Sequence, residues 1–319
     1  MNASVSATER QRSTHCRLVE ELIRHQLPGG GWSHHGAQFA TEATSWALLA
    51  LRSFQAGSHA LEQGLRRLMS QRQMDGLWPS VIDGAGASLW ATAVGLNTLV
   101  VLGANSEASS PSLDSLIRGR PLEASWLVRL KFRFSDRQVR FDPTKYGWPW
   151  VPETVSWVLP TSMAMIALQR AKKRGLVGGT EVETRLRLAA EMLLDRACVG
   201  GGWNAGNAAV YGVSLRPHID ATAIALAALR PHYQNLIVRD SLTWLLARVD
   251  CPSAYSLAWL ILAAATYRDV RADVIPALTA ACNHLAALVE DPRGIQDKST
   301  IALAALALGV DSNPFEVNA

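Results

Sequence analysis

The sequence predicts an all-α fold, an (α/α)6 toroid of six helical hairpins with an inner and an outer layer of helices. Three observations lead to this prediction: a repeated phrase, a high apolar content, and an alternation of two helix types. Of the 319 residues, 49% are hydrophobic and only 18% are charged, so most helices must be buried on more than one side.

The repeated phrase is a glycine-tryptophan loop, then an acidic or polar residue, then a helix rich in alanine and leucine. Its copies lie at 29–51, 75–99, 147–168 and 200–229. Repeats a few tens of residues apart are typical of supersecondary units that bury their apolar faces only against each other. We therefore expect a single domain over 15–312, with a disordered N-terminal tail over 1–14 and a C-terminal tail over 313–319.

Twelve helical segments alternate in character. One class is rich in alanine and leucine, and we expect it in the inner layer: 42–55, 88–102, 160–172, 219–230, 254–268 and 298–309. The other class carries arginine and glutamate on one side, and we expect it in the outer layer: 15–26, 60–73, 113–134, 181–197, 235–249 and 271–289. Apolar helices that alternate with half-polar ones indicate two concentric layers.

The loops that lead from an outer to an inner helix are mostly long and rich in glycine, tryptophan, proline and histidine. Long loops inside a compact domain usually carry function. We expect them to gather on one rim, over the mouth of a central cavity.

Charge and composition argue against several function classes. The net charge is only +4, and no basic run is longer than the one at 172–174, so nucleic-acid binding is not predicted. No stretch has about 18 consecutive apolar residues, as a membrane-spanning helix needs. The N-terminus has no apolar core of a signal peptide, and the four cysteines form no CxxC pair. These features predict a cytoplasmic protein and leave peripheral membrane contact open.

Several segments resemble known repeats. Segments 26–32 and 73–78 resemble the QW repeat of squalene-type cyclases, and 147–150 with 156–161 resembles bacterial squalene-cyclase repeat proteins. Leu159 stands where those proteins usually carry a glutamate. On these motifs the chain resembles the superfamily of terpenoid cyclases and protein prenyltransferases, which are α/α toroids, and in particular squalene-hopene cyclase-like proteins.

Cyclases of that superfamily that protonate an isoprenoid carry a DxDD motif whose middle aspartate donates the proton. The stretch His218-Ile219-Asp220-Ala221 aligns with it, so the resemblance implies Asp220 as the catalytic acid, with His218 beside it. His218 and Ala221 replace two carboxylates that normally help to hold the donor protonated. From the residues alone, Asp220 has a second interpretation, as a cap for the helix that follows.

Three further polar residues are candidates for substrate binding. Glu42 and Glu153 are the other carboxylates expected near the rim, where either one orients a substrate, replaces the missing partners of Asp220, or only caps a helix. Tyr211 lies in a long loop and is a candidate proton relay.

The eleven tryptophans form a second set of candidates. Aromatic faces stabilise a cation without reacting with it, which suits a carbocation cascade. Trp46, Trp90, Trp148 and Trp157 are therefore candidates for substrate binding, with a packing role as the alternative. For Trp32, Trp78 and Trp203 we expect the packing role, in which the indole pins neighbouring hairpins.

The sequence predicts no metal site and no cofactor. The pair His34-His35 has no third ligand at a suitable spacing, and Asp250-Cys251 is only a partial match to the zinc ligands of protein prenyltransferases. The aspartate-rich motif that binds diphosphate through magnesium is also absent from the sequence.

The resemblance implies a metal-independent class II type terpene cyclase, which starts carbocation cyclisation of an isoprenoid substrate by protonation. One alternative is a non-catalytic toroid that binds an apolar ligand or a protein partner. Another is a subunit similar to those of protein prenyltransferases.

Overall fold

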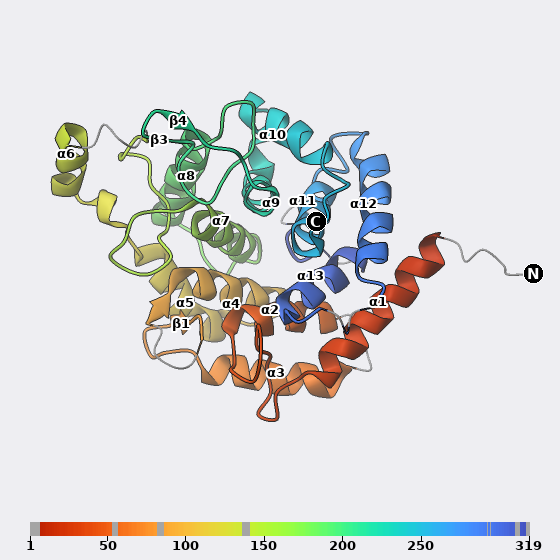
Figure 1. The fold of residues 1–319 in the computed structure, drawn as a ribbon. Helices are drawn as coiled ribbons and strands as arrows, with labels where there is room; N and C mark the ends of the chain where they lie inside the picture. The colour runs from red at the N-terminus through yellow and green to blue at the C-terminus, as the bar shows by residue number, and fades with distance from the viewer. Residues whose placement is uncertain are drawn as a thin grey trace, which may run out of the picture.

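A computed structural model describes residues 7–52, 57–81, 86–135, 141–291, 293, 295–309 and 313–316. Within them, six helices form a closed inner ring: α2 (Thr41–Leu51), α4 (Leu89–Val101), α7 (Val158–Lys173), α9 (Ile219–Ala228), α11 (Ala254–Ala265) and α13 (Lys298–Leu308). Each one packs against the next, and α13 packs against α2 (Figure 1). The predicted α/α toroid is confirmed.

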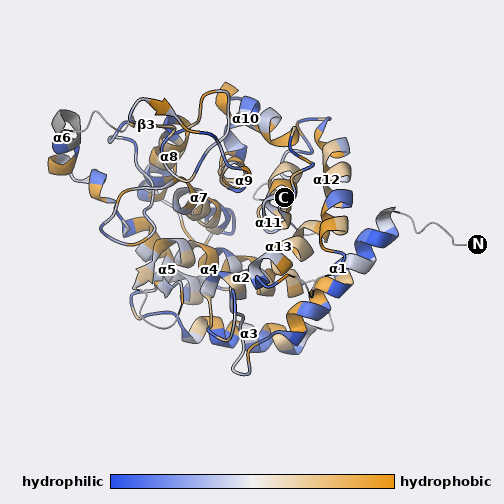
Figure 2. Ribbon diagram, viewed as in Figure 1, coloured by the Kyte–Doolittle hydropathy of each residue, from blue (hydrophilic) through white to orange (hydrophobic). Residues whose placement is uncertain are grey.

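The outer layer covers this ring. It consists of α1 (Ala7–Arg24), α3 (Ser58–Ser70), α5 (Ser106–Arg118), α8 (Thr180–Asp195), α10 (Leu236–Leu246) and α12 (Val274–Leu288). All thirteen residues of α4 are buried, whereas α3 buries only three of its thirteen. Outer helices such as α1 accordingly show hydrophilic and hydrophobic stripes (Figure 2). The assignment of the two classes to the two layers is therefore correct.

The prediction of one outer helix over 113–134 is wrong, because this stretch forms the end of one helix, a short 3₁₀ turn and a second helix. Helix α5 begins at Ser106, where Asn105 caps it by accepting a hydrogen bond from Ala108 N. The chain turns extended at Gly119, and Pro121 cannot continue a helix because it lacks an N–H. A short 3₁₀ turn, η2 (Leu122–Ala124), and helix α6 (Trp126–Ser135) follow.

Described residues inside both expected tails take part in the fold. Helix α1 begins at Ala7, inside the expected N-terminal tail. At the other end, Asn313 donates a hydrogen bond to Leu262 O (2.7 Å), and Phe315 is only 1% exposed. Arg170, in the last turn of α7, donates to Pro314 O (2.6 Å), so this segment lies at the carboxyl ends of the inner helices.

Four tryptophans repeat one packing arrangement. Each indole N–H donates to a leucine carbonyl at the end of the preceding outer helix, and each backbone N–H donates to the hydroxyl of the fourth residue of an inner helix. The tryptophans are Trp32, Trp78, Trp148 and Trp203, and the hydroxyls belong to Thr44, Thr92, Thr161 and Thr222. The packing role predicted for Trp32, Trp78 and Trp203 matches this arrangement.

The loops before the inner helices are joined around one rim. The first N–H of α2 donates to Ser80 O in the loop before α4, and that of α4 donates to Trp150 O in the loop before α7. Val158 N of α7 donates to Ala205 O in the loop before α9. The orphan N–H groups at the helix starts are thus satisfied by the neighbouring hairpin, and the long loops lie side by side as predicted.

These loops also contain two minimal hairpins that the sequence did not predict. Strand β1 (Trp78–Pro79) pairs antiparallel with β2 (Ala87–Ser88), with Trp78 opposite Ser88. Strand β3 (Ala209–Val210) pairs with β4 (Val213–Ser214), with Val210 opposite Val213. No helix of the described residues is long and apolar enough to cross a membrane.

Candidate functional site

The second residue of each inner helix belongs to one layer at the rim. Because the fourth residues of four inner helices all bind a rim tryptophan in the same way, these helices start in register. Parallel helices in register present the same position to the same side. We call the set of second residues the rim layer: Glu42, Trp90, Leu159, Asp220, Tyr255 and Ser299.

Glu42 connects two predicted tryptophans. Its carboxylate accepts a hydrogen bond from Trp90 Nε1 (2.9 Å), across from α4, and one from Trp46 Nε1 (3.3 Å), one turn along α2. Trp46 is fully buried and Trp90 is 5% exposed. Charged acceptors make such hydrogen bonds stronger, so Glu42 fixes the orientation of both indole rings.

Tyr255 lies among three carboxylates. Burial raises the pKa of its hydroxyl, the negative charges of Glu42, Asp220 and Asp297 raise it further, and the indole of Trp259 acts in the opposite direction. The hydroxyl therefore stays protonated and is available as a hydrogen-bond donor. The three carboxylates that act on this hydroxyl lie at the starts of α2, α9 and α13.

Asp220 is half-buried in the first turn of α9, and its carboxylate does not cap that helix. Among the described residues it accepts no hydrogen bond from an N–H of α9, and the helix has no side-chain cap. His218 stands at the N-cap with an exposed side chain, and its backbone N–H donates to Trp203 O (2.8 Å). The N-cap position belongs to His218, whereas the charge of Asp220 lies in the first turn, at the positive end of α9.

His34 and Asp297 form a charged pair beside the layer. Asp297 caps α13 by accepting hydrogen bonds from Ser299 N (3.1 Å) and Thr300 N (3.0 Å), and its pKa is lowered to about 2, because its hydrogen bonds outweigh burial. The hydrogen bond with Asp297 and the charge of Glu42 raise the pKa of His34, whose Nδ1 lies 3.7 Å from Asp297 Oδ1. Over the described part of the chain, no group of three His, Cys, Asp or Glu side chains is placed to hold a metal ion.

Aromatic rings lie below and beside these polar groups. Trp46, Trp259 and Phe315 form a buried triad with ring centroids 4.8 to 5.6 Å apart. Trp90 packs against Trp150 at 5.3 Å. The C-terminal segment thus contributes Phe315 to the aromatic floor of the ring.

Four predicted site residues lie apart from this cluster. Trp148 belongs to the packing set and is fully buried, and Trp157 is 37% exposed and lies against Gly206. Glu153 is exposed and lines a surface pocket with residues of η2, and Tyr211 is 71% exposed in the turn between β3 and β4.

Sequence reasoning missed Tyr255, Asp297 and Phe315, and it considered His34 only as a metal ligand. One signal was present for Tyr255. When each inner helix is counted from its first residue, Tyr255 holds the same position as Glu42 and Asp220. No comparable local signal marks Phe315, because its contacts come from helices distant in the sequence.

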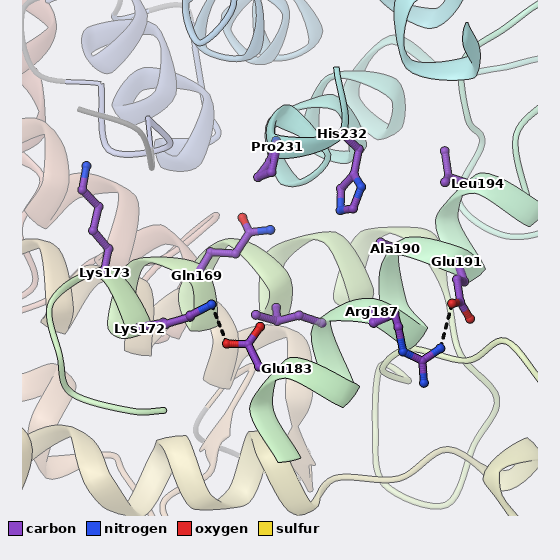
Figure 3. A pocket seen from close by; sticks show the side chains of 11 residues that line it. Gln169, Lys172, Lys173, Glu183, Arg187, Ala190, Glu191, Leu194, Pro231 and His232 are labelled. Carbon is purple, nitrogen blue, oxygen red and sulfur yellow. Dashed lines mark hydrogen bonds and ion pairs between the residues drawn. The ribbon is translucent and has the colours of Figure 1, made fainter. Parts of the chain in front are cut away.

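A separate pocket of about 640 Å³ lies at the other end of α7, between α8 and the 3₁₀ turn η3 (Arg230–His232) (Figure 3). Its charges are paired: Lys172 with Glu183 at 2.5 Å and Arg187 with Glu191 at 2.7 Å. It contains none of the rim-layer residues, and we place the candidate site at the rim on the contacts of Glu42 with Trp46 and Trp90.

Comparison with known proteins supports the fold. No protein-family model and no curated sequence matches the chain. The type II terpene cyclase MstE from Scytonema, in complex with its product merosterolic acid A, is similar with a TM-score of 0.61 and 14% identity over 95% of this chain and 97% of that one. MstE has also been solved with its substrate geranylgeranyl dihydroxybenzoate.

Two other enzymes share the architecture. The ent-copalyl diphosphate synthase of Streptomyces platensis has a TM-score of 0.57 and 19% identity, over 84% of this chain and 50% of that one. The cellobiose 2-epimerase of Spirochaeta thermophila has a TM-score of 0.56 and 12% identity, over 93% and 96%. The α/α toroid is thus shared with enzymes of both terpenoid and sugar chemistry, and at these identities the likeness concerns the fold.

Proposed function

We propose that this α/α toroid, which has the fold of type II terpene cyclases, protonates an isoprenoid alkene or epoxide and so starts its cyclisation. The observation that carries the proposal is the position of Asp220. Its carboxyl group is not engaged as a helix cap, belongs to the rim layer, and lies close enough to Tyr255 to influence the pKa of that hydroxyl.

In the proposed reaction, protonated Asp220 gives its proton to one carbon of a terminal double bond. The electron pair of that bond forms the new C–H bond, the neighbouring carbon becomes a tertiary cation, and Asp220 is left as a carboxylate. The next double bond then attacks the cation, and a final loss of a proton gives the neutral product. Tyr255 remains protonated throughout this step, because burial and the charges of Glu42, Asp220 and Asp297 raise the pKa of its hydroxyl.

The aromatic residues would serve the cationic part of the reaction. Trp46, Trp90 and Trp150 are aromatic rings of the kind whose faces stabilise positive charge, although Trp46 itself is fully buried. Glu42 acts through two of these rings as a positioning residue, because it holds both indole N–H groups. An isoprenoid chain folded against these rings is the substrate class that this arrangement fits best.

One observation favours the alternative of a non-catalytic toroid that binds an apolar ligand. The two residues that flank Asp220 in the motif are His218 and Ala221, so no carboxylate of α9 helps to keep Asp220 protonated. Whether the protein converts a polyene or only binds it decides between the two functions.

The test is incubation of the purified chain with geranylgeranyl-bearing polyenes and with squalene, without added metal. We expect cyclised product from the wild type, and at least a 100-fold loss of turnover in Asp220→Asn, since a general acid contributes roughly 10²–10⁴. The matched control is Asp240→Asn, an exposed carboxylate of outer helix α10, which should keep full activity. Product formation by Asp220→Asn at the wild-type rate would refute the role of Asp220. Polyene binding without turnover by the wild type would establish the alternative.

A further inference from the structure

Three apolar side chains of helix α6 are exposed. Trp126 is 66% exposed, Leu127 59% and Leu130 47%, and Leu122 in the adjoining η2 is also exposed. Figure 1 shows that α6 stands away from the toroid, on the stretch that joins α5 to α7. Most outer helices bury their apolar face against an inner helix, so the orientation of α6 needs a different explanation.

The arrangement of charge around this face is also specific. At about 100° per residue, Trp126, Leu127 and Leu130 share one side of the helix, and Arg129 and Lys131 fall at its two edges. The ten residues of α6 include three basic residues and no acidic one. Val128, on the opposite side, is half-buried.

An apolar face that carries a tryptophan and is flanked by basic residues is typical of helices that lie in the plane of a membrane interface. The indole sits at the level of the headgroups, the leucines reach the acyl boundary, and the basic residues meet acidic lipids. A second copy of this chain would bring the basic residues of two such faces together, which argues against self-association. We propose that α6 binds the surface of a bilayer that contains anionic phospholipids.

The proposal is independent of the reaction carried out at the rim layer.

The experiment is sedimentation of the full chain with vesicles of phosphatidylcholine alone or with a quarter of phosphatidylserine. We expect binding to the anionic vesicles that weakens severalfold at high salt. The double variant Trp126→Glu/Leu130→Glu should lose at least tenfold in binding. The control Leu236→Glu changes a side chain that is 68% exposed on α10 and should bind like the wild type.

A second variant separates charge from apolar contact. Arg129→Gln/Lys131→Gln should bind both vesicle types equally, because it lacks the cations that select acidic lipid. Failure of the wild type to sediment with anionic vesicles would overturn the proposal, as would unchanged binding by both double variants. If the wild type is a dimer without lipid and Trp126→Glu/Leu130→Glu is a monomer, the face is a self-association surface and the proposal is wrong.

Discussion

Six of the tryptophans have one of two roles, and the position of each residue in its hairpin decides between them. A tryptophan in the rim loop, such as Trp203, is fully buried. Its indole N–H donates to a leucine carbonyl and its backbone N–H donates to a threonine hydroxyl. A tryptophan inside an inner helix, such as Trp46 or Trp90, donates instead to the carboxylate of Glu42. Only the tryptophans inside the inner helices, Trp46 and Trp90, form hydrogen bonds to a residue of the candidate site.

His34 makes the stability of the rim depend on pH. Its pKa is raised above 6.5 by Asp297 and Glu42, so its contribution is fully present below pH 6.5 and is lost as pH rises through the raised value. We expect His34→Asn to be less stable than the wild type by up to about 1 kcal/mol at pH 6, and the difference to close at pH 9. Urea unfolding at the two pH values measures this.

The neighbouring His35→Asn is the control for that experiment, because His35 is exposed in the same loop. It should unfold like the wild type at both pH values. Equal stability of His34→Asn and the wild type at pH 6 would contradict the assigned pair.

At the scale of the elements, the hairpins depend on close backbone contacts between a rim loop and an outer helix. Gly76 has φ +83°, and a Cβ at this position would lie 2.3 Å from the carbonyl of Pro111 in α5. Its carbonyl also accepts a hydrogen bond from Ser112 Oγ (2.7 Å). The glycine therefore allows loop and helix to touch, in addition to supplying the turn.

This contact predicts different effects at two glycines of similar conformation. Gly36 has φ +73° with no atom within 4 Å of its Cβ position, so Gly36→Ala should cost only the backbone strain of about 1–2 kcal/mol. Gly76→Ala should cost about 1–3 kcal/mol more, because the Pro111 backbone must move. Urea unfolding of both variants measures the two losses of stability. Equal losses would contradict the prediction, because they would show that the loop at Gly76 moves away from α5 without a cost in stability.

For the whole molecule, the C-terminal segment closes the ring at the end opposite the rim. Phe315 packs between Trp46 and Trp259, and Arg170 holds the backbone at Pro314 and Glu316. Burial lowers the pKa of Arg170 to about 10, and the nearby Arg52 and Arg174 lower it in the same direction. The segment therefore connects the arginines at one end of the toroid to the aromatic floor of the site.

Phe315→Ala should destabilise the protein by about 3–5 kcal/mol, because it opens a cavity in a packed aromatic cluster. Phe315→Leu keeps most of the apolar contact and should cost clearly less. Urea unfolding measures the stability of both variants. If Phe315→Ala is as stable as the wild type, Phe315 does not pack tightly against Trp46 and Trp259. If the proposed cyclase function is correct, Phe315→Ala also deepens the site and shifts the preference toward longer polyenes.

The helices were largely predictable, because their signals are local. The start of α9 at Ile219, for example, agrees with the expected residue. The failure at 113–134 came from two local signals that were overlooked, the cap at Asn105 and the stop at Pro121. Of the expected site residues, Glu42, Trp46, Trp90 and Asp220 belong to the cluster at the rim, whereas Glu153 and Tyr211 point into other surroundings.

By itself the sequence determined the repeated hairpin, since apolar periodicity and the glycine-tryptophan loop act within a few tens of residues. Only the tertiary structure decided which side chains meet. The contacts of Glu42 with Trp90 and of Phe315 with Trp46 join segments that are far apart in the chain. These contacts form only when the ring closes, so that every inner helix packs against two neighbours, and no local segment contains that arrangement.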